Sequence, residues 1–188
     1  MKLAILADDF TGALDTSVQF SSRGISTVLT SGEQPWKLMP ENCEVLTMDL
    51  QTRHLPPADV YRRVYRAAEE LRKKNVSYLY IKTDSGMRGN VGAALAAAAD
   101  SWKSSVYFVP AYPKTGRTVV DGTLYVDGKP VSESVFGEDI FSVPGHSCNL
   151  LRTVWILTAI LTAYLISFFI FSVLLPAFLK RSVVVCSH

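Results

Sequence analysis

Two adjacent carboxylates, Asp8 and Asp9, follow the first apolar segment of the chain and are the first candidates for chemistry. Neighbouring carboxylates repel and raise each other's pKa unless a cation or hydroxyl donors lie between them. Such a carboxylate can accept a hydrogen bond from a ligand hydroxyl, or remove its proton as a general base. An acid at this place can also cap a helix, with help from Thr11, but a cap needs one acid and not two. We therefore predict Asp8 and Asp9 as catalytic candidates and leave open which one is the base.

A second polar group follows a later apolar run, and it consists of Lys82, Asp84, Ser85 and Arg88. Its arginine suits two-pronged capture of a carboxylate or phosphate. Gly86 and Gly89 would let the backbone approach a ligand closely. A helix beginning near Gly89 or Asn90 would direct free N–H groups at an anion. The structural alternative is an ion pair of Asp84 with Lys82 or Arg88 that only fixes the loop.

Arg117 is the third candidate and follows two prolines and Gly116 in the segment PAYPKTGRT, which stiffen its loop. Lys114 in the same loop is expected to be exposed. Cations able to bind a carboxylate, together with three acids able to accept hydroxyl hydrogens, predict a pocket for a small polyhydroxy acid. This inference gives a substrate class and not a reaction.

The elements that must position these residues alternate between strand and helix. Strands are predicted at 2–7, 26–30, 45–50, 76–81 and 106–109, and helices at 12–22, from 57 to about 74, and at 91–99. This alternation predicts an α/β fold with an open, mostly parallel sheet and helices on both faces. Asp121-Gly122 and Asp127-Gly128 predict tight turns of an antiparallel hairpin addition. In such a sheet the loops after the strands share one edge, where ligands bind.

The composition changes abruptly near residue 140. All 17 acidic residues precede it, against 16 Lys and Arg, whereas the last 49 residues carry three bases and no acid. We therefore expect one domain over 1–140 and an unrelated hydrophobic, helix-like tail over 141–188. The small net charge argues against a nucleic-acid partner. The N-terminus does not resemble a secretory signal, and three widely spaced cysteines fit a reducing compartment, so the cytoplasm is expected. No metal-binding spacing is present.

The segment 154–179 is uncharged for 26 residues, which is long enough to span a bilayer. Two hypotheses follow. The tail is a translation product of a shifted frame that replaces the rest of a longer protein, or it is a membrane anchor, in which case the chain is a membrane-anchored protein.

The segments ILADDFTGALDTSVQF, IKTDSGMRGNVGAAL and VPAYPKTGRTVVDGTLYVDGKPVSES resemble, in order, the N-terminal domain of the four-carbon acid sugar kinase family. The resemblance covers about residues 3 to 139. It implies an ATP-dependent kinase that phosphorylates the terminal hydroxyl of threonate, erythronate or 3-oxo-tetronate. Gly86 and Met87 depart from the Thr and apolar residue usual at these positions.

The resemblance also implies site residues and cofactors. The implied substrate-binding residues are Thr11, Gly12, Asp15, Lys82, Asp84, Ser85, Arg88, Gly89, Asn90 and Arg117, with Thr83 and Gly116 in the same blocks. ATP and Mg²⁺ are implied for the family's separate nucleotide domain, which the sequence does not resemble after residue 140. No phosphate loop of the Walker type is present, so we expect little kinase activity from this chain alone.

Two alternatives from other classes stay open on the sequence. Receiver-like phosphoacceptor domains also carry paired acids after the first strand and a phosphorylated Asp after the third, where Asp49 stands. Their Lys after the fifth strand corresponds only roughly to Lys114, and the alternative assigns no task to Arg88 or Arg117. The second alternative is a tail-anchored membrane protein whose soluble domain binds a partner. The oligomeric state is not predicted.

Overall fold

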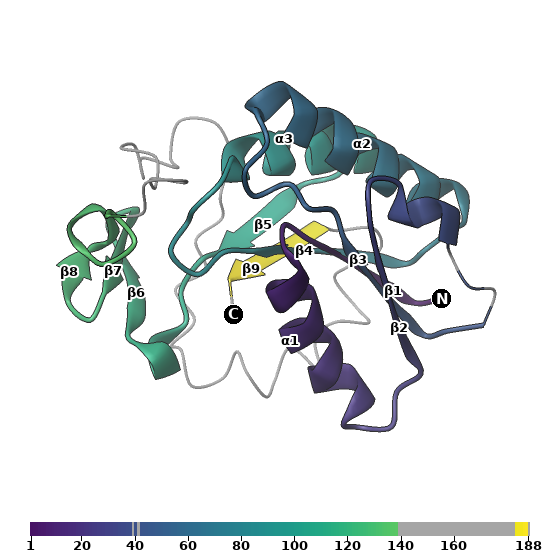
Figure 1. Cartoon of the computed structure of the whole chain (residues 1–188), viewed down its shortest axis with the longest axis horizontal. Helices are drawn as coiled ribbons and strands as arrows, with labels where there is room; N and C mark the ends of the chain where they lie inside the picture. The colour runs from purple at the N-terminus through teal and green to yellow at the C-terminus, as the bar shows by residue number, and fades with distance from the viewer. Residues whose placement is uncertain (39, 41, 139–182, 188) are drawn as a thin grey trace.

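A six-stranded sheet, parallel throughout, forms the centre of the computed structural model (Figure 1). Residues 1–38, 40, 42–138 and 183–187 are described by the structure. The strand order is β2-β3-β1-β4-β9-β5. The strands are β1 (Leu3–Ala7), β2 (Thr27–Ser31), β3 (Val45–Asp49), β4 (Tyr78–Thr83), β5 (Val106–Val109) and β9 (Val183–Ser187).

Helices cover both faces of this sheet. α2 (Pro57–Lys73) and α3 (Val91–Trp102) pack side by side on one face, and α1 (Phe10–Ser21) lies on the other (Figure 1). α2 begins at a proline, which suits the first helical position because its missing N–H would have no intrahelical partner. Its buried stripe consists of Val60, Val64, Ala67, Ala68 and Leu71. Short 3₁₀ helices occur at Pro35–Leu38, Pro113–Thr115 and Val131–Glu133.

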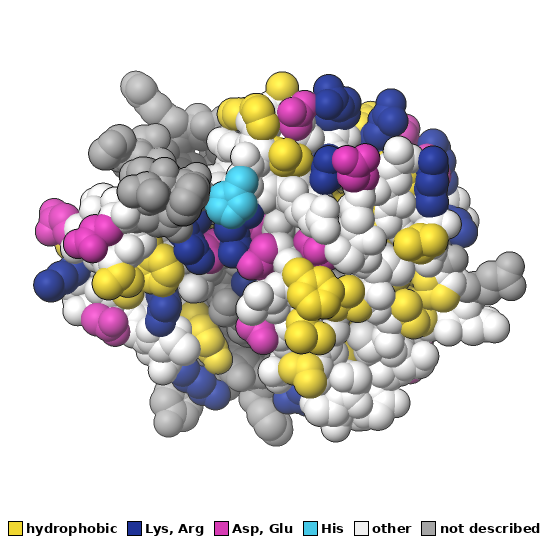
Figure 2. Space-filling view, viewed as in Figure 1, with side chains coloured by type: hydrophobic (Ala, Val, Ile, Leu, Met, Phe, Trp, Pro, Cys, Tyr) yellow, Lys and Arg dark blue, Asp and Glu magenta, His cyan; other side chains and the backbone are white. Residues whose placement is uncertain are grey.

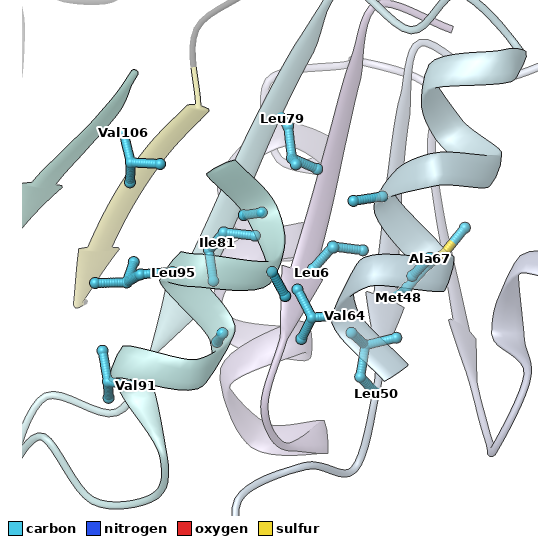
Figure 3. Packing of buried hydrophobic residues seen from close by; sticks show 14 of the residues in the cluster. Leu6, Met48, Leu50, Val64, Ala67, Leu79, Ile81, Val91, Leu95 and Val106 are labelled. Carbon is cyan, nitrogen blue, oxygen red and sulfur yellow. The ribbon is translucent and has the colours of Figure 1, made fainter. Parts of the chain in front are cut away.

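The main core lies between the sheet and the pair of helices α2 and α3. Leu6, Met48 and Ile81 from three neighbouring strands meet Val64 and Leu95 from the two helices (Figure 3). The small side chains of the alanine-rich α3 allow this helix to approach α2 and the sheet closely. A rigid sheet edge is therefore available to position the loops that follow the strands.

A second sheet of three antiparallel strands follows the fifth strand of the chain. It consists of β6 (Arg117–Val120), β7 (Thr123–Val126) and β8 (Lys129–Pro130), in that order. Asp121-Gly122 and Asp127-Gly128 have φ values between 48° and 80°, as turns of type I′ require. The predicted fold class, a mostly parallel α/β sheet with an antiparallel addition, is confirmed.

The C-terminal expectations fall mostly outside the described residues. The boundary near residue 140 and the uncharged segment 154–179 lie in that part of the chain, so the tail hypotheses stay predictions. The strand Val183–Ser187 was not predicted, and it pairs in parallel with β4 and β5. Within the described ranges, no helix is both long enough and apolar enough to cross a membrane.

Candidate functional site

Three loops meet at the carboxyl edge of the parallel sheet. In the strand register, Ala7 at the end of β1 lies opposite Asp49 of β3 on one side and Lys82 of β4 on the other. The loop that begins with Asp8 therefore lies between the loops that follow β3 and β4. Figure 2 shows cationic and acidic side chains next to one another in a hollow on this face.

Arg53, in the loop after β3, lies at the centre of this group. Its guanidinium donates two hydrogen bonds to Asp8, at 2.9 and 3.0 Å, and one to Asp9 at 2.5 Å. It also lies 3.6 Å from Asp84 Oδ1. Its side chain is only 13% exposed, so these ion pairs are shielded from solvent. The adjacent carboxylates are thus held together by a cation that the sequence analysis missed.

Burial changes the proton affinity of this cluster. Desolvation raises the pKa of Asp8 above its usual value, although the hydrogen bonds and charge of Arg53 oppose the change. Burial by itself lowers the pKa of Arg53, but its hydrogen bonds and charge interaction with Asp8 outweigh this effect and raise it. A carboxylate with a raised pKa at a sheet edge is suited to accept a proton.

Two hydrogen bonds, one to each carboxylate oxygen, hold the side chain of Asp9 in place. It is the N-cap of α1, where its Oδ1 accepts a hydrogen bond from the N–H of Gly12 at 2.8 Å, and its other oxygen binds Arg53. The capping alternative is therefore confirmed for Asp9. Gly12 is buried, and a Cβ added there would lie 2.8 Å from Asp9 Oδ1 and 3.4 Å from Lys82 Nζ. This glycine therefore leaves room for both charged groups.

Asp84 and Arg88 form an ion pair within the loop after β4. Arg88 donates to the two Asp84 oxygens at 2.8 and 2.9 Å, and the N–H groups of Gly86 and Arg88 also donate to Asp84. Burial alone would raise the pKa of Asp84, but the Arg88 hydrogen bonds and the charges of Arg53 and Arg88 outweigh it and lower that pKa. The predicted loop-fixing ion pair is thus present, with Arg88 as the partner.

Lys82 is a buried cation, with its side chain pointing into the same cluster. It is 3% exposed, and its ammonium donates to the carbonyl oxygen of Thr83 at 2.6 Å. In the described part of the chain it forms no ion pair within 4.0 Å. Burial lowers the pKa of Lys82, and the charges of Asp8, Asp84 and Asp9 oppose this only in part. Its remaining N–H groups can therefore serve a ligand.

The other residues predicted to bind substrate lie outside the ion-pair network of Arg53. Gly89 has a φ of +83°, and a Cβ there would lie 3.0 Å from the carbonyl oxygen of Arg53. Asn90 precedes α3 and donates to the carbonyl oxygen of Leu55 at 2.8 Å, which ties two loops together. Thr11 and Asp15 are exposed on α1, and Ser85 is half-buried. Among the described residues, none of these three side chains forms a hydrogen bond or ion pair with Arg53.

Arg117 begins β6, and its guanidinium lies over the ring of Phe136, 5.5 Å from the ring centre. Arg88 lies over the same ring at 5.3 Å. Phe136 thus links the loop of Arg117 to the loop after β4. The sequence analysis did not predict this role, because Phe136 is a single aromatic residue in the segment VFGED and belongs to no motif.

A narrow cavity of about 20 Å³ opens among these loops. Its polar lining comes from Asp8, Thr52, Arg53, Lys82, Thr83, Arg88 and Asn90. This volume accommodates about one water molecule, so a larger ligand would lie at its mouth. Gly89 also lines it, and the remaining lining is apolar and includes Leu6, Val64 and Ile81 of the core.

The described acids do not form a magnesium site as they stand. Each oxygen of Asp8, Asp9 and Asp84 already accepts a hydrogen bond from an arginine or a backbone N–H. Among the described residues no group of three or more His, Cys, Asp and Glu is placed to hold a metal ion. In this arrangement the three carboxylates are neutralised by Arg53 and Arg88 rather than gathered around a cation site.

The receiver-like alternative receives no support from Asp49. This residue is 1% exposed, and its oxygens accept hydrogen bonds from Ser31 Oγ at 2.6 Å and from the N–H of Gln51 at 3.0 Å. A phosphoacceptor must be reachable by its donor. Lys114 is exposed, as expected, and among the described residues it forms no ion pair with this aspartate within 4.0 Å.

Comparison with known proteins gives consistent matches. The family model "Sugar-binding N-terminal domain" matches residues 3–160. A D-threonate kinase from Bordetella bronchiseptica is 39% identical over 142 residues, which are 73% of this chain and 35% of the relative. A 3-oxo-tetronate kinase from Escherichia coli is 33% identical over 139 residues, 71% of this chain and 36% of the relative.

Solved structures agree with this result. A domain of unknown function from Bordetella bronchiseptica, crystallised with bound citrate as a domain-swapped dimer, superposes with a TM-score of 0.74 at 36% identity. The match covers 79% of this chain and 38% of that one. This chain thus spans about a third of the length of the curated relatives it matches.

Proposed function

Because the chain belongs to the family of sugar-binding N-terminal domains, we propose that it is the substrate-binding part of an ATP-dependent kinase that phosphorylates the terminal hydroxyl of a four-carbon sugar acid. The resemblance inferred from three sequence segments is confirmed at the level of the family. The names of the relatives support the kinase class and the four-carbon acids. The reaction and substrate of this chain remain our proposal.

The observation that carries the proposal is the charge balance of the buried cluster. Three carboxylates, Asp8, Asp9 and Asp84, lie with Arg53, Lys82 and Arg88 at one sheet edge. Arg117 joins them through Phe136 and brings the cations to four. Among these seven side chains, four cations against three carboxylates leave one positive charge, and Lys82 and Arg117 have no carboxylate partner within 4.0 Å among the described residues. These two cations suit a ligand with one carboxylate and hydroxyl groups as further hydrogen-bond partners.

The proposed roles follow from the contacts of each side chain. Lys82, with N–H groups to spare, and Arg117 would bind the carboxylate, and Arg53 would hold the two adjacent acids in place. Asp8 is the proposed general base, because its raised pKa favours proton uptake from a hydroxyl. Asp9 is assigned a positioning role, because it caps α1 and binds Arg53.

ATP and Mg²⁺ would be supplied to the reaction by parts of the longer relatives that this chain does not match. We accordingly propose that the chain alone has little kinase activity, and that it acts in the cytoplasm on a small molecule. A membrane location applies only if the segment 154–179 is a genuine anchor.

Isothermal titration of the full chain with D-threonate, D-erythronate and the neutral polyol threitol tests this proposal. We expect binding of at least one acid and a clear preference over threitol. Adding ATP and Mg²⁺ to the same mixtures should give no appreciable ADP. Absence of binding by both acids would refute the substrate-binding role, and rapid phosphorylation would refute the proposed inactivity.

A further inference from the structure

Phe136 fills the space in front of Gly86 and places two guanidinium groups over one ring. A Cβ added at Gly86 would lie 2.4 Å from two carbons of the Phe136 ring, so any larger residue at position 86 would displace the ring. Arg88 and Arg117 lie over this ring at 5.3 and 5.5 Å from its centre. The aromatic face attracts both cations and so restrains where they lie.

The two arginines differ in what they offer a ligand. Arg88 is neutralised by its paired hydrogen bonds to Asp84. Arg117 has no acidic partner within 4.0 Å among the described residues, and the only hydrogen bond that its side chain donates to them is to the carbonyl oxygen of Thr115. Its Nε is buried and has no hydrogen-bond partner among the residues that the structure describes. Such a donor is costly to leave unpaired, and a carboxylate would satisfy it.

We propose that Phe136 is a specificity-determining residue of the sugar-acid site. It acts by holding the guanidinium of Arg117 beside the cluster, in position to receive the ligand carboxylate. Phe136 is a positioning residue, because it acts through Arg117, and Gly86 is the position that makes room for it. This inference rests on the proposed function. It deepens that function by assigning to Phe136 and Arg117 the preference of the site for an acid over a neutral polyol.

The distinguishing experiment measures that preference. Titrations with D-threonate and threitol compare the wild-type full chain with Phe136→Leu, which keeps apolar bulk but removes the aromatic face. Phe136→Trp retains that face, and Val135→Ala is the matched control at an adjacent side chain that is 75% exposed. We expect Phe136→Leu to weaken threonate binding about tenfold with little change for threitol. Phe136→Trp should retain the preference, and Val135→Ala should leave both affinities unchanged.

Gly86→Ala provides an independent perturbation of the same contact. Its added methyl group must move the Phe136 ring, so the preference for the acid should fall as it does in Phe136→Leu. The double variant Gly86→Ala/Phe136→Leu should lose no more than either single variant, because both act through the ring. Circular dichroism and thermal unfolding of every variant identify loss of fold, which would weaken both ligands alike.

The outcomes separate the two proposals. If the wild-type chain binds threonate but Phe136→Leu keeps its preference over threitol, the role of Phe136 is refuted and the proposed function stands. Equal weakening of acid and polyol would also refute it, since that indicates a structural role alone. If the wild-type chain binds no four-carbon acid, both proposals fall together.

Discussion

Replacing Arg53 by methionine removes the cation that holds Asp8 and Asp9 together, while keeping a long unbranched side chain. The wild-type guanidinium makes two bonds to Asp8 and one to Asp9, and the three side chains are between 13% and 26% exposed. Breaking a largely buried ion pair by deleting one partner costs about 3–5 kcal/mol, because the remaining charge is left uncompensated. We expect a loss of this size in the free energy of unfolding.

The assay is urea denaturation at about pH 7.5 and about pH 5, with the transition followed by circular dichroism. A loss of about 3–5 kcal/mol corresponds to a melting temperature lower by roughly 6–20 °C for a chain of this size. The slope of the free energy against urea should not change. Arg62→Met is the control, because its ion pair with Asp59 is exposed and contributes less than about 0.5 kcal/mol.

The pH dependence tests the electrostatic explanation. Without Arg53, the already raised pKa of Asp8 rises further, so the protonated acid is the form the fold prefers. A raised carboxyl pKa means that stability is retained at low pH and lost as pH rises through the folded-state pKa. The deficit of Arg53→Met should therefore shrink from pH 7.5 to pH 5. A deficit that is the same at both pH values would refute the reasoning and indicate lost packing alone.

Two further variants of the cluster have opposite expected effects. Lys82→Met should abolish threonate binding in titrations yet raise stability by about 1–2 kcal/mol near pH 7, because burial lowers the Lys82 pKa and makes its charged form costly. This gain should fade as pH rises from the lowered folded-state pKa of Lys82 to the unfolded value of about 10.4, because the folded wild-type lysine loses its charge first. Asp84→Asn should lower stability by about 3–5 kcal/mol at pH 7 in urea denaturation. Because the Asp84 pKa is lowered, its stabilising contribution is present above the unfolded value of about 3.9 and lost as pH falls through the folded one, so the two proteins should converge in acid.

The sequence predicted the strands and helices that carry strong local patterns. The stripe from Val60 to Leu71 and the Asp-Gly turns at 121 and 127 depend on neighbouring residues, so they are visible without tertiary information. β9 was missed because its partners, β4 and β5, lie far away in the sequence, and the pairing itself defines the strand. Two predicted helix ends differ by two or three residues, at Phe10 and Trp102, and the other ends agree within about one residue.

The candidate site was predicted in part. The carboxyl edge of the sheet was correctly expected to collect Asp8, Lys82 and Asp84, because parallel strands bring their following loops together. The same rule applied to the loop after β3 would have indicated Arg53, which the search for motifs passed over. Phe136 could not be predicted, since its contact with Arg88 and Arg117 depends on how the hairpin packs against the loop after β4.

The cluster contains groups that oppose folding as well as groups that support it. Ionised Asp8 and protonated Lys82 are both disfavoured by burial, and in the described part of the chain the Nε of Arg117 lacks a hydrogen-bond partner. A network that only fixed loops would be more stable with apolar residues at such positions. Asp84 differs from these groups. Its pKa is lowered, because Arg88 and Arg53 stabilise its ionised form. The Asp84–Arg88 pair therefore holds the loop, and the costly groups beside it are those that a bound carboxylate and its hydroxyls would satisfy.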